Sequence, residues 1–249
     1  MVLTQSIRFG NDNTATLIRG DTDGQLSALV EELLGAPPRG LVILNGGTAH
    51  LANELAQQLA RALQDGLANV VAAERLTVIT GGTDAGIFHL FGRGRAQWGA
   101  AAPCIGVAVA NLVTWPGKED GEAPLEPNHS HFVLTDGDHW GDETETMYAL
   151  VRALAAECLS VAVFAGGGEI TIHEMQANVA QGRPMIMLAG SGRATDKVLA
   201  ARTGQPVDDA RLVEIAQAGQ ILPFDLAEPP SVLAELVRNT LGLASVGSG

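Results

Sequence analysis

VAVFAGGGEITIHE, residues 161–174, decides the fold, because an apolar run typical of a β-strand ends in three glycines and then opens into a helix-like segment. The same order occurs in LVILNGGTAH at 41–50 and in LTVITGGTDAG at 76–86. Glycine lets the backbone turn tightly and approach a ligand, and the start of a helix directs free N–H groups and partial positive charge at an anion. At the carboxyl ends of neighbouring parallel strands, three such loops would share one crevice. The sequence therefore predicts one site for a nucleotide or a sugar phosphate.

Strand-like and helix-like segments alternate through most of the chain, which predicts an α/β protein with a Rossmann-like, doubly wound, mostly parallel sheet and helices on both faces. The apolar runs lack a polar alternate residue, as expected of strands covered on both sides. We expect strands over 41–44, 75–80, 104–110, 132–135, 160–165, 184–188 and 220–224, and helices over 49–65, 85–97, 142–157, 171–181, 208–218 and 230–242.

The chain of 249 residues fits one nucleotide-binding domain, 1–249, since domains commonly have about 100–200 residues and no segment has the composition of a linker. Within it, a hairpin and a helix over 1–38 are expected as an appendage to the alternating part. Residues 243–249 are expected to form a frayed tail.

Charge and hydropathy exclude several classes of partner. Fifteen Lys and Arg residues against 28 Asp and Glu residues give a net charge of −13, which repels nucleic acid polymers and anionic membranes. No apolar run approaches the ~20 residues that a membrane helix needs, and the N-terminus lacks a signal pattern, so we expect a cytoplasmic protein without membrane insertion. A free nucleotide remains compatible, because backbone N–H groups can hold a phosphate without basic side chains.

The glycine loop at 166–168 carries a more specific pattern. Its spacing, Gly167-Gly168-x-x-Thr171-x-x-Glu174, resembles the G-G-x-G-T-x-x-E signature of the SLOG superfamily, which includes the cytokinin-activating phosphoribohydrolases once named lysine decarboxylases. Ile170 stands where that family has its third glycine. The resemblance implies ligand binding at this loop, and the same superfamily contains ligand-sensing modules without catalysis.

A second segment narrows the resemblance. Residues 126–137, EPNHSHFVLTDG, are similar to a stretch in the N-terminal homology region of melastatin-type TRP channels. The order of the glycine loops and of this His-rich segment also agrees, so the chain resembles the prokaryotic LSDAT branch of SLOG proteins. That resemblance implies an ADP-ribose-like or other NAD-derived nucleotide as ligand, no further required cofactor, and a homodimer. If the chain is a sensor, we expect its effector to be a separate protein, because the sequence indicates no second domain.

The candidate ligand-binding residues come from the three glycine loops, the His-rich segment and a fourth loop over 190–196. They are Gly46, Gly47, Thr48, Gly81, Gly82, Thr83, Asp84, Gly86, His129, Ser130, His131, Gly166, Gly167, Gly168, Glu169, Thr171, Glu174 and Arg193.

Several of these residues allow two interpretations. Thr48 and Thr83 suit helix N-caps as well as ligand contacts. Asp84 and Glu169 would either accept from ribose hydroxyls or cap a helix in solvent. In the His129–His131 pair, one imidazole would donate to the ligand while the other holds the loop to the sheet. We expect no metal there, because zinc needs three or four ligands and no third is evident beyond the cluster Asp136, Asp138, His139 and Asp142.

Two functions from different classes remain open. The first is a sensor or carrier that binds the nucleotide without turnover. The second is hydrolysis of the N-glycosidic bond of a nucleoside monophosphate or NAD derivative, with Glu174 assisting the departing base and Arg152 as a weaker catalytic candidate. The phosphoribohydrolases carry an Arg-Lys pair where this chain has only Arg152, which favours binding without turnover. Trp115, in the long segment 111–131, would either stack on a base or pin that segment to the sheet.

Overall fold

The computed structural model describes residues 3–19, 25–47, 52–99 and 102–243, with the side chains of residues 25–27 and 31 excepted. Nine strands form one sheet in the order β1-β2-β8-β5-β4-β3-β9-β10-β11. Only β1 and β2 pair antiparallel, and every other neighbouring pair is parallel. The predicted Rossmann-like α/β fold is confirmed. The strands of this sheet are β1 (Leu3–Arg8), β2 (Thr14–Arg19), β3 (Leu41–Gly46), β4 (Thr77–Thr80), β5 (Cys104–Val109), β8 (His131–Thr135), β9 (Ser160–Ala165), β10 (Met185–Ala189) and β11 (Ile221–Asp225).

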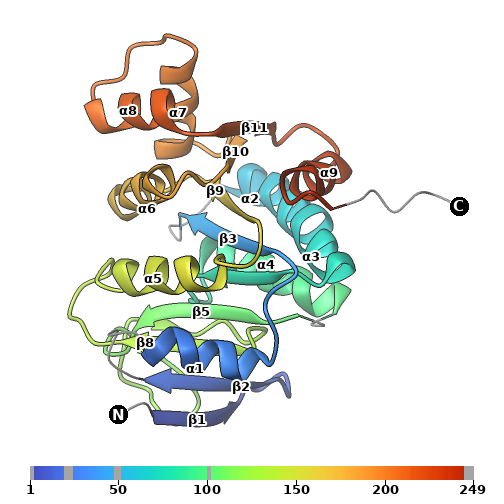
Figure 1. Cartoon of the computed structure of the whole chain (residues 1–249), viewed down its shortest axis with the longest axis vertical. Coiled ribbons are helices and arrows are strands. Elements are labelled where there is room, and N and C mark those ends of the chain that lie inside the picture. Colours follow the sequence, from blue (N-terminus) through green and yellow to red (C-terminus); the bar gives the residue numbers. More distant parts are fainter. Residues whose placement is uncertain (1–2, 20–24, 48–51, 100–101, 244–249) are drawn as a thin grey trace, which may run out of the picture.

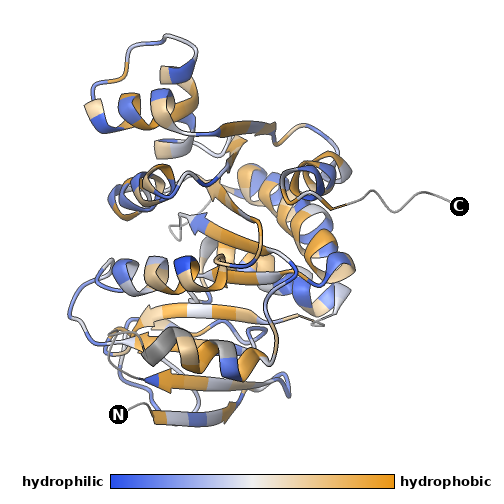
Figure 2. Ribbon diagram, in the orientation of Figure 1, coloured by the Kyte–Doolittle hydropathy of each residue, from blue (hydrophilic) through white to orange (hydrophobic). Residues whose placement is uncertain are grey.

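Helices cover both faces of the sheet (Figure 1). On one side lie α1 (Gln25–Leu34), α5 (Thr144–Leu154), α6 (Glu169–Ala180), α7 (Arg193–Arg202) and α8 (Ala210–Ala218). On the other lie α2 (Asn53–Ala60), η1 (Arg61–Ala68), α3 (Asn69–Glu74), α4 (Gly86–Trp98) and α9 (Pro230–Thr240). Figure 2 shows the apolar residues along the central strands, and neighbouring strand residues such as Ile43 and Leu44 belong to the cores of opposite faces.

The strand order reverses between β3 and β9. From β3 the chain proceeds through β4, β5 and β8 in one direction, and from β9 it proceeds through β10 and β11 in the other. In open α/β sheets, the crevice at the carboxyl ends of the strands beside such a reversal is the usual ligand site. Two of the three glycine loops, those after β3 and β9, therefore lie at the position where the topology predicts a ligand.

The N-terminal hairpin extends this sheet, because β2 pairs in parallel with β8. The segment 111–131 covers the same end of the sheet and contains the two-residue strands β6 (Val113–Thr114) and β7 (Ala123–Pro124). Trp115 packs against the small core of this region and has the Lys118 ammonium 5.2 Å from its ring centre. Trp115 was expected either to stack on a base or to pin the segment to the sheet, and the structure shows the second role.

Two helices differ from the sequence prediction. The helix expected to end at residue 65 continues as α2, η1 and α3 to Glu74, with a π-helical middle. A glycine is found inside this helix, at Gly66, because α9 packs directly on that position. A Cβ on residue 66 would lie only 2.9 Å from the Pro230 carbonyl oxygen. Residues 190–196 were expected as a loop, but α7 already begins at Arg193.

Candidate functional site

The loops after β3 and β9 touch at the reversal point. Gly47 donates its N–H to the Ala165 carbonyl at 2.9 Å. A Cβ on Gly46 would overlap that same carbonyl, and Gly167, with φ +88°, has the Thr171 side chain where its own Cβ would be. These contacts require glycine, because only a backbone without side chains can approach so closely and adopt the left-handed region. We call residues 46–47 and 165–167 the glycine ridge.

A cavity of about 310 Å³ opens on one side of the ridge, and we call it the glycine cavity. Its lining includes Gly47, Gly166, Gly167, Ser191 and the exposed Arg193. The backbone N–H groups of Gly167 and Gly168 immediately precede α6 and donate to no other group in the described part of the chain. Free N–H groups at a helix start beside an arginine form an arrangement suited to a phosphate.

A second cavity, of about 250 Å³, lies on the other side of the ridge, and we call it the acidic cavity. Each cavity alone is at or below the small end of the range for ligand sites, roughly 300–1,000 Å³. The acidic cavity is lined by Gly46, Gly81, Thr83, Ala85, Phe88, Glu122, Ala123, Trp140, Glu143, Ile170, Thr171 and Glu174.

Glu174 is the most buried carboxyl group of the acidic cavity, with 7% of the residue exposed. Burial, together with the nearby Glu143 carboxylate, raises the pKa of Glu174 to about 8, although the Thr171 hydroxyl opposes the shift. Burial likewise raises the pKa of Glu143. At neutral pH the Glu174 carboxyl group is therefore largely protonated and can donate a hydrogen bond.

A buried polar network lies behind Glu174. The Tyr148 hydroxyl accepts from Asn45 Nδ2 at 2.9 Å and from Asn178 Nδ2 at 2.6 Å, and Asn178 Oδ1 accepts from Arg183 at 2.8 Å. Asn45 Oδ1 is buried without a hydrogen-bond partner in the described part of the chain. The network joins β3, α5 and α6 just below the ridge and thereby fixes the helix that carries Glu174.

Residues 39–234 match the protein family described as "SLOG in TRPM, prokaryote". The chain belongs to this family. It is also similar to the transient receptor potential cation channel subfamily M member 2 of Rattus norvegicus, with 24% identity over 218 residues, and of Mus musculus, with 25%. Each alignment covers 72% of this chain and 14% of the channel. The resemblance that the two motifs indicated is therefore confirmed, and the chain corresponds to a small part of these channels.

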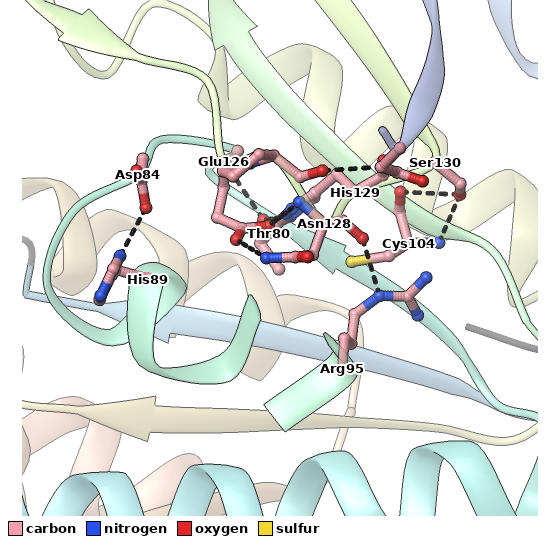
Figure 3. Close-up of polar contacts among 12 residues, drawn as sticks. Thr80, Asp84, His89, Arg95, Cys104, Glu126, Asn128, His129 and Ser130 are labelled. Carbon is pink, nitrogen blue, oxygen red and sulfur yellow. Dashed lines mark hydrogen bonds and ion pairs between the residues drawn. The ribbon is translucent and has the colours of Figure 1, made fainter. Parts of the chain in front are cut away.

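In this SLOG chain the His-rich segment is an internal support (Figure 3). His129 is fully buried and bonds through Nδ1 to Glu126 at 2.7 Å and through Nε2 to Thr80 at 2.8 Å. Burial lowers the pKa of His129, but the Cys104 thiol and the Glu126 carboxylate outweigh this effect and raise it to about 9. Ser130 bonds to the backbone of Cys104.

Neither His129 nor Ser130 lines the two cavities, and neither does the half-buried His131, which contacts Ser130 at 2.9 Å. The structure thus supports the loop-holding role for His129. His131 is the first residue of β8, two positions after His129, and burial lowers the pKa of His131.

The structure brings together the predicted residues that line either cavity, and it places the others apart. Those that line a cavity are Gly46, Gly47, Gly81, Thr83, Gly166, Gly167, Thr171, Glu174 and Arg193. Gly82 is buried against β5, and Gly86 and Gly168 stand at the starts of α4 and α6. Thr48 lies outside the described residues.

Three predicted charged residues have other surroundings. Asp84 Oδ1 accepts a hydrogen bond from the His89 imidazole Nδ1 at 2.6 Å, beside the acidic cavity. Glu169 pairs with Arg211 on the exposed surface between α6 and α8, with one contact at 3.0 Å. Arg152 is exposed on α5 and lines neither cavity.

Sequence reasoning missed the acidic cavity's Glu122, Trp140 and Glu143 and the buried Asn45 and Tyr148. Asn45 could have been identified from the sequence, because it is the residue between an apolar strand and the two glycines that follow it. Glu122, Trp140 and Glu143 come from two separate segments, and only the packing of residues 122–123 and 140–143 beside α6 brings them to one cavity. Tyr148 lies outside that cavity, in the network with Asn45 and Asn178. In the described residues, no helix is long and apolar enough to cross a membrane, and no group of three His, Cys, Asp or Glu residues has metal-binding geometry.

Proposed function

We propose that this SLOG protein is a sensor that binds a nucleotide or nucleotide sugar of the ADP-ribose or NAD-derived class across the glycine ridge. Its phosphate would lie in the glycine cavity and its sugar and base in the acidic cavity. The observation that carries the proposal is the pair of free N–H groups on Gly167 and Gly168 beside Arg193 at the strand-order reversal. These groups supply the positive potential that a phosphate requires in a chain of net charge −13.

The sensor role is favoured over turnover by what surrounds the ridge. In the part of the chain that the structure describes, no lysine, arginine or histidine lines the acidic cavity, so none of these residues supplies a cation there to stabilise a leaving group or orient a water molecule. A cytoplasmic sensor of this kind would act on a separate effector protein, and a homodimer would offer one route to that signal.

One observation supports the alternative, hydrolysis of an N-glycosidic bond. Glu174 holds a proton at neutral pH and lines the cavity beside the phosphate cradle. A carboxylic acid so placed could protonate a departing base, as general acids do. Loss of base from the bound nucleotide is therefore the result that would favour the enzyme.

The test is a thermal-shift and calorimetric screen with ADP-ribose, NAD, AMP and ribose 5-phosphate, followed by chromatography of each incubated ligand. Binding at 100 times Kd stabilises the native state by about 2.7 kcal/mol. Arg193→Gln should weaken a phosphate-bearing ligand roughly tenfold, since a charge-assisted hydrogen bond is lost. Arg93→Gln is the matched control, because Arg93 is exposed on α4 and lines neither cavity. Equal affinity of both variants, or no ligand that binds, would overturn the proposal.

A further inference from the structure

The acidic cavity has an unusual charge distribution for a nucleotide-binding protein. Within residues 3–19, 25–47, 52–99 and 102–243, its three titratable groups, Glu122, Glu143 and Glu174, are carboxyl groups, and no basic residue from these ranges lines it. None of the three forms an ion pair with any residue that the structure describes. The cavity therefore repels phosphate and attracts positive charge, in contrast to the glycine cavity on the other side of the ridge.

Of the three carboxyl groups, Glu174 would gain the most from a positively charged partner. More than nine-tenths of it is buried, it lines the cavity, and Thr171 is the neighbour that lowers its pKa. An ionised carboxylate in such a place is costly without a counter-ion, because burial removes its hydration. A cation in the cavity would supply that counter-ion.

Two aromatic side chains complete the cavity. Trp140 lines the cavity together with Ile170, Thr171 and Glu174 of α6, and its indole N–H donates to Glu122 at 2.7 Å. Phe88 of α4 packs against Gly81 at the floor. Aromatic faces attract organic cations through their π-electrons, most strongly for tryptophan, and they also suit a flat ring. A bare metal ion fits less well, because the described carboxylates form no metal-binding cluster.

We propose that the acidic cavity selects a positively charged, planar organic group, so that the ligand is a nucleotide whose base is a cationic ring of the N-ribosylpyridinium type. This inference rests on the proposed function, because it requires the phosphate of the same molecule to lie in the glycine cavity. The ring would lie between Trp140, Phe88 and the three carboxylates, while Gly167, Gly168 and Arg193 hold the phosphate across the ridge.

Binding of a cation also predicts a proton balance. A positive ring beside Glu174 favours its ionised form, so complex formation below about pH 8 expels the proton that Glu174 holds in the free protein. The other groups that face Glu174 are Glu143 in the cavity and the Tyr148 hydroxyl behind it, with Arg183 reaching the network through Asn178. A neutral ring would leave the Glu174 proton in place.

The experiment compares nicotinamide mononucleotide, whose ring is a cation, with its reduced dihydropyridine form, whose ring is neutral. Both carry the same ribose phosphate. Calorimetry at about pH 7, in buffers of different ionisation enthalpy, measures Kd and the protons released. We expect the cationic form to bind at least tenfold more tightly, with release of up to one proton, and the neutral form to release none.

Three variants with the same change in formal charge test the residues. Glu174→Gln should reduce the preference for the cationic ring to less than threefold, whereas Glu214→Gln, on the exposed face of α8, should keep it. Glu122→Gln retains a hydrogen-bond acceptor for Trp140 at an exposed position and should lower the preference by a smaller factor; it decides the matter if Glu174→Gln does not fold. An unchanged preference in every folded cavity variant would overturn the assignment.

The ligand comparison separates the two proposals. Equal affinity for the two ring forms, or tighter binding of the neutral form, would overturn this inference and leave the phosphate site standing. If neither form binds, and ADP-ribose and ribose 5-phosphate do not bind either, the proposed function fails and this inference fails with it.

Discussion

The N–H of Gly47 donates to the carbonyl of Ala165 at 2.9 Å, and this bond joins the end of β3 to the end of β9 where the strand order reverses. The two loops therefore form one continuous ridge with a phosphate-compatible cavity on one side and an acidic cavity on the other. A displacement of either loop would alter both cavities together.

Gly46→Ala should destabilise the fold, because the new Cβ would overlap the Ala165 carbonyl and the backbone at Gly46 has φ +148°. Overpacking of this kind typically costs about 1–3 kcal/mol. Gly168→Ala is the matched control, since a Cβ there meets nothing within 4 Å and its φ is −127°. We expect the control to remain within about 0.5 kcal/mol of wild type in urea unfolding. Equal stability of the two variants would show that the ridge accommodates a methyl group at residue 46 without loss of stability.

Tyr148→Phe should cost about 1–3 kcal/mol, because it removes the hydroxyl that accepts from both Asn45 and Asn178 and leaves two buried amide donors without that partner. Tyr148 is the one tyrosine of the sequence, so loss of tyrosine absorbance verifies the variant directly. Unfolding by urea, followed by far-ultraviolet circular dichroism, measures the change. A loss below about 0.5 kcal/mol would mean that the two amides find other partners.

Glu126→Gln should destabilise the protein strongly and leave nucleotide affinity almost unchanged in the folded fraction. Glu126 is 1% exposed and accepts from the Asn128 backbone and side chain and from His129. Removal of one partner from a buried charge pair typically costs about 3–5 kcal/mol. Glu119→Gln, on the exposed part of the same segment, should be near neutral. A large loss of affinity at wild-type stability would instead assign the His-rich segment a direct role in binding.

The sequence predicted the sheet well because its signal is local. Unbroken apolar runs marked β3, β4, β5 and β9, and the glycines after β3, β4 and β9 marked the ends of those strands, so the crevice was predicted from the strand pattern. The continuation of the helix past Gly66 could not be read, since a glycine in a helix looks like a stop unless the partner that packs on it is known.

The sequence predicted the glycine loops of the site but only some of the side chains that line its cavities. Gly167 and Glu174 belong to one short signature, whereas Trp140 and Glu122 reach the acidic cavity from separate segments and are joined by a hydrogen bond that no spacing reveals. The role of His129 could not be decided from the sequence, although its position in a motif was clear. Two imidazoles on either side of one residue suit a ligand site and a buried support equally, and only the full burial of His129 against Glu126 and Thr80 distinguishes the two roles.

The pH dependence of stability gives a test of Glu174 that needs no ligand. Its pKa in the folded protein, about 8, lies above the ~4.3 of an exposed glutamate. A raised folded pKa contributes stability that is fully present below the unfolded pKa and is lost as pH rises through the folded pKa, so the loss extends from about pH 4.5 to about pH 8. Within this window the slope approaches 1.4 kcal/mol per pH unit, as an upper limit.

Two other groups with shifted pKa values, His129 and Glu126, affect stability outside the range from about pH 5 to 6.5. The raised pKa of His129 removes stability only above about pH 6.5, and the lowered pKa of Glu126 removes it as pH falls below about 4.5. Urea unfolding between about pH 5 and 6.5 therefore reports on the carboxyl groups of the acidic cavity together with His131, whose lowered pKa has the opposite sign. The difference between wild type and Glu174→Gln cancels His131 and Glu143 and leaves the contribution of Glu174. The variant imitates the neutral form, so it should nearly match wild type at pH 5 and become the more stable protein as pH rises. Parallel stability curves for the two proteins would show that Glu174 ionises normally, and its burial would then need a positive partner already within the protein.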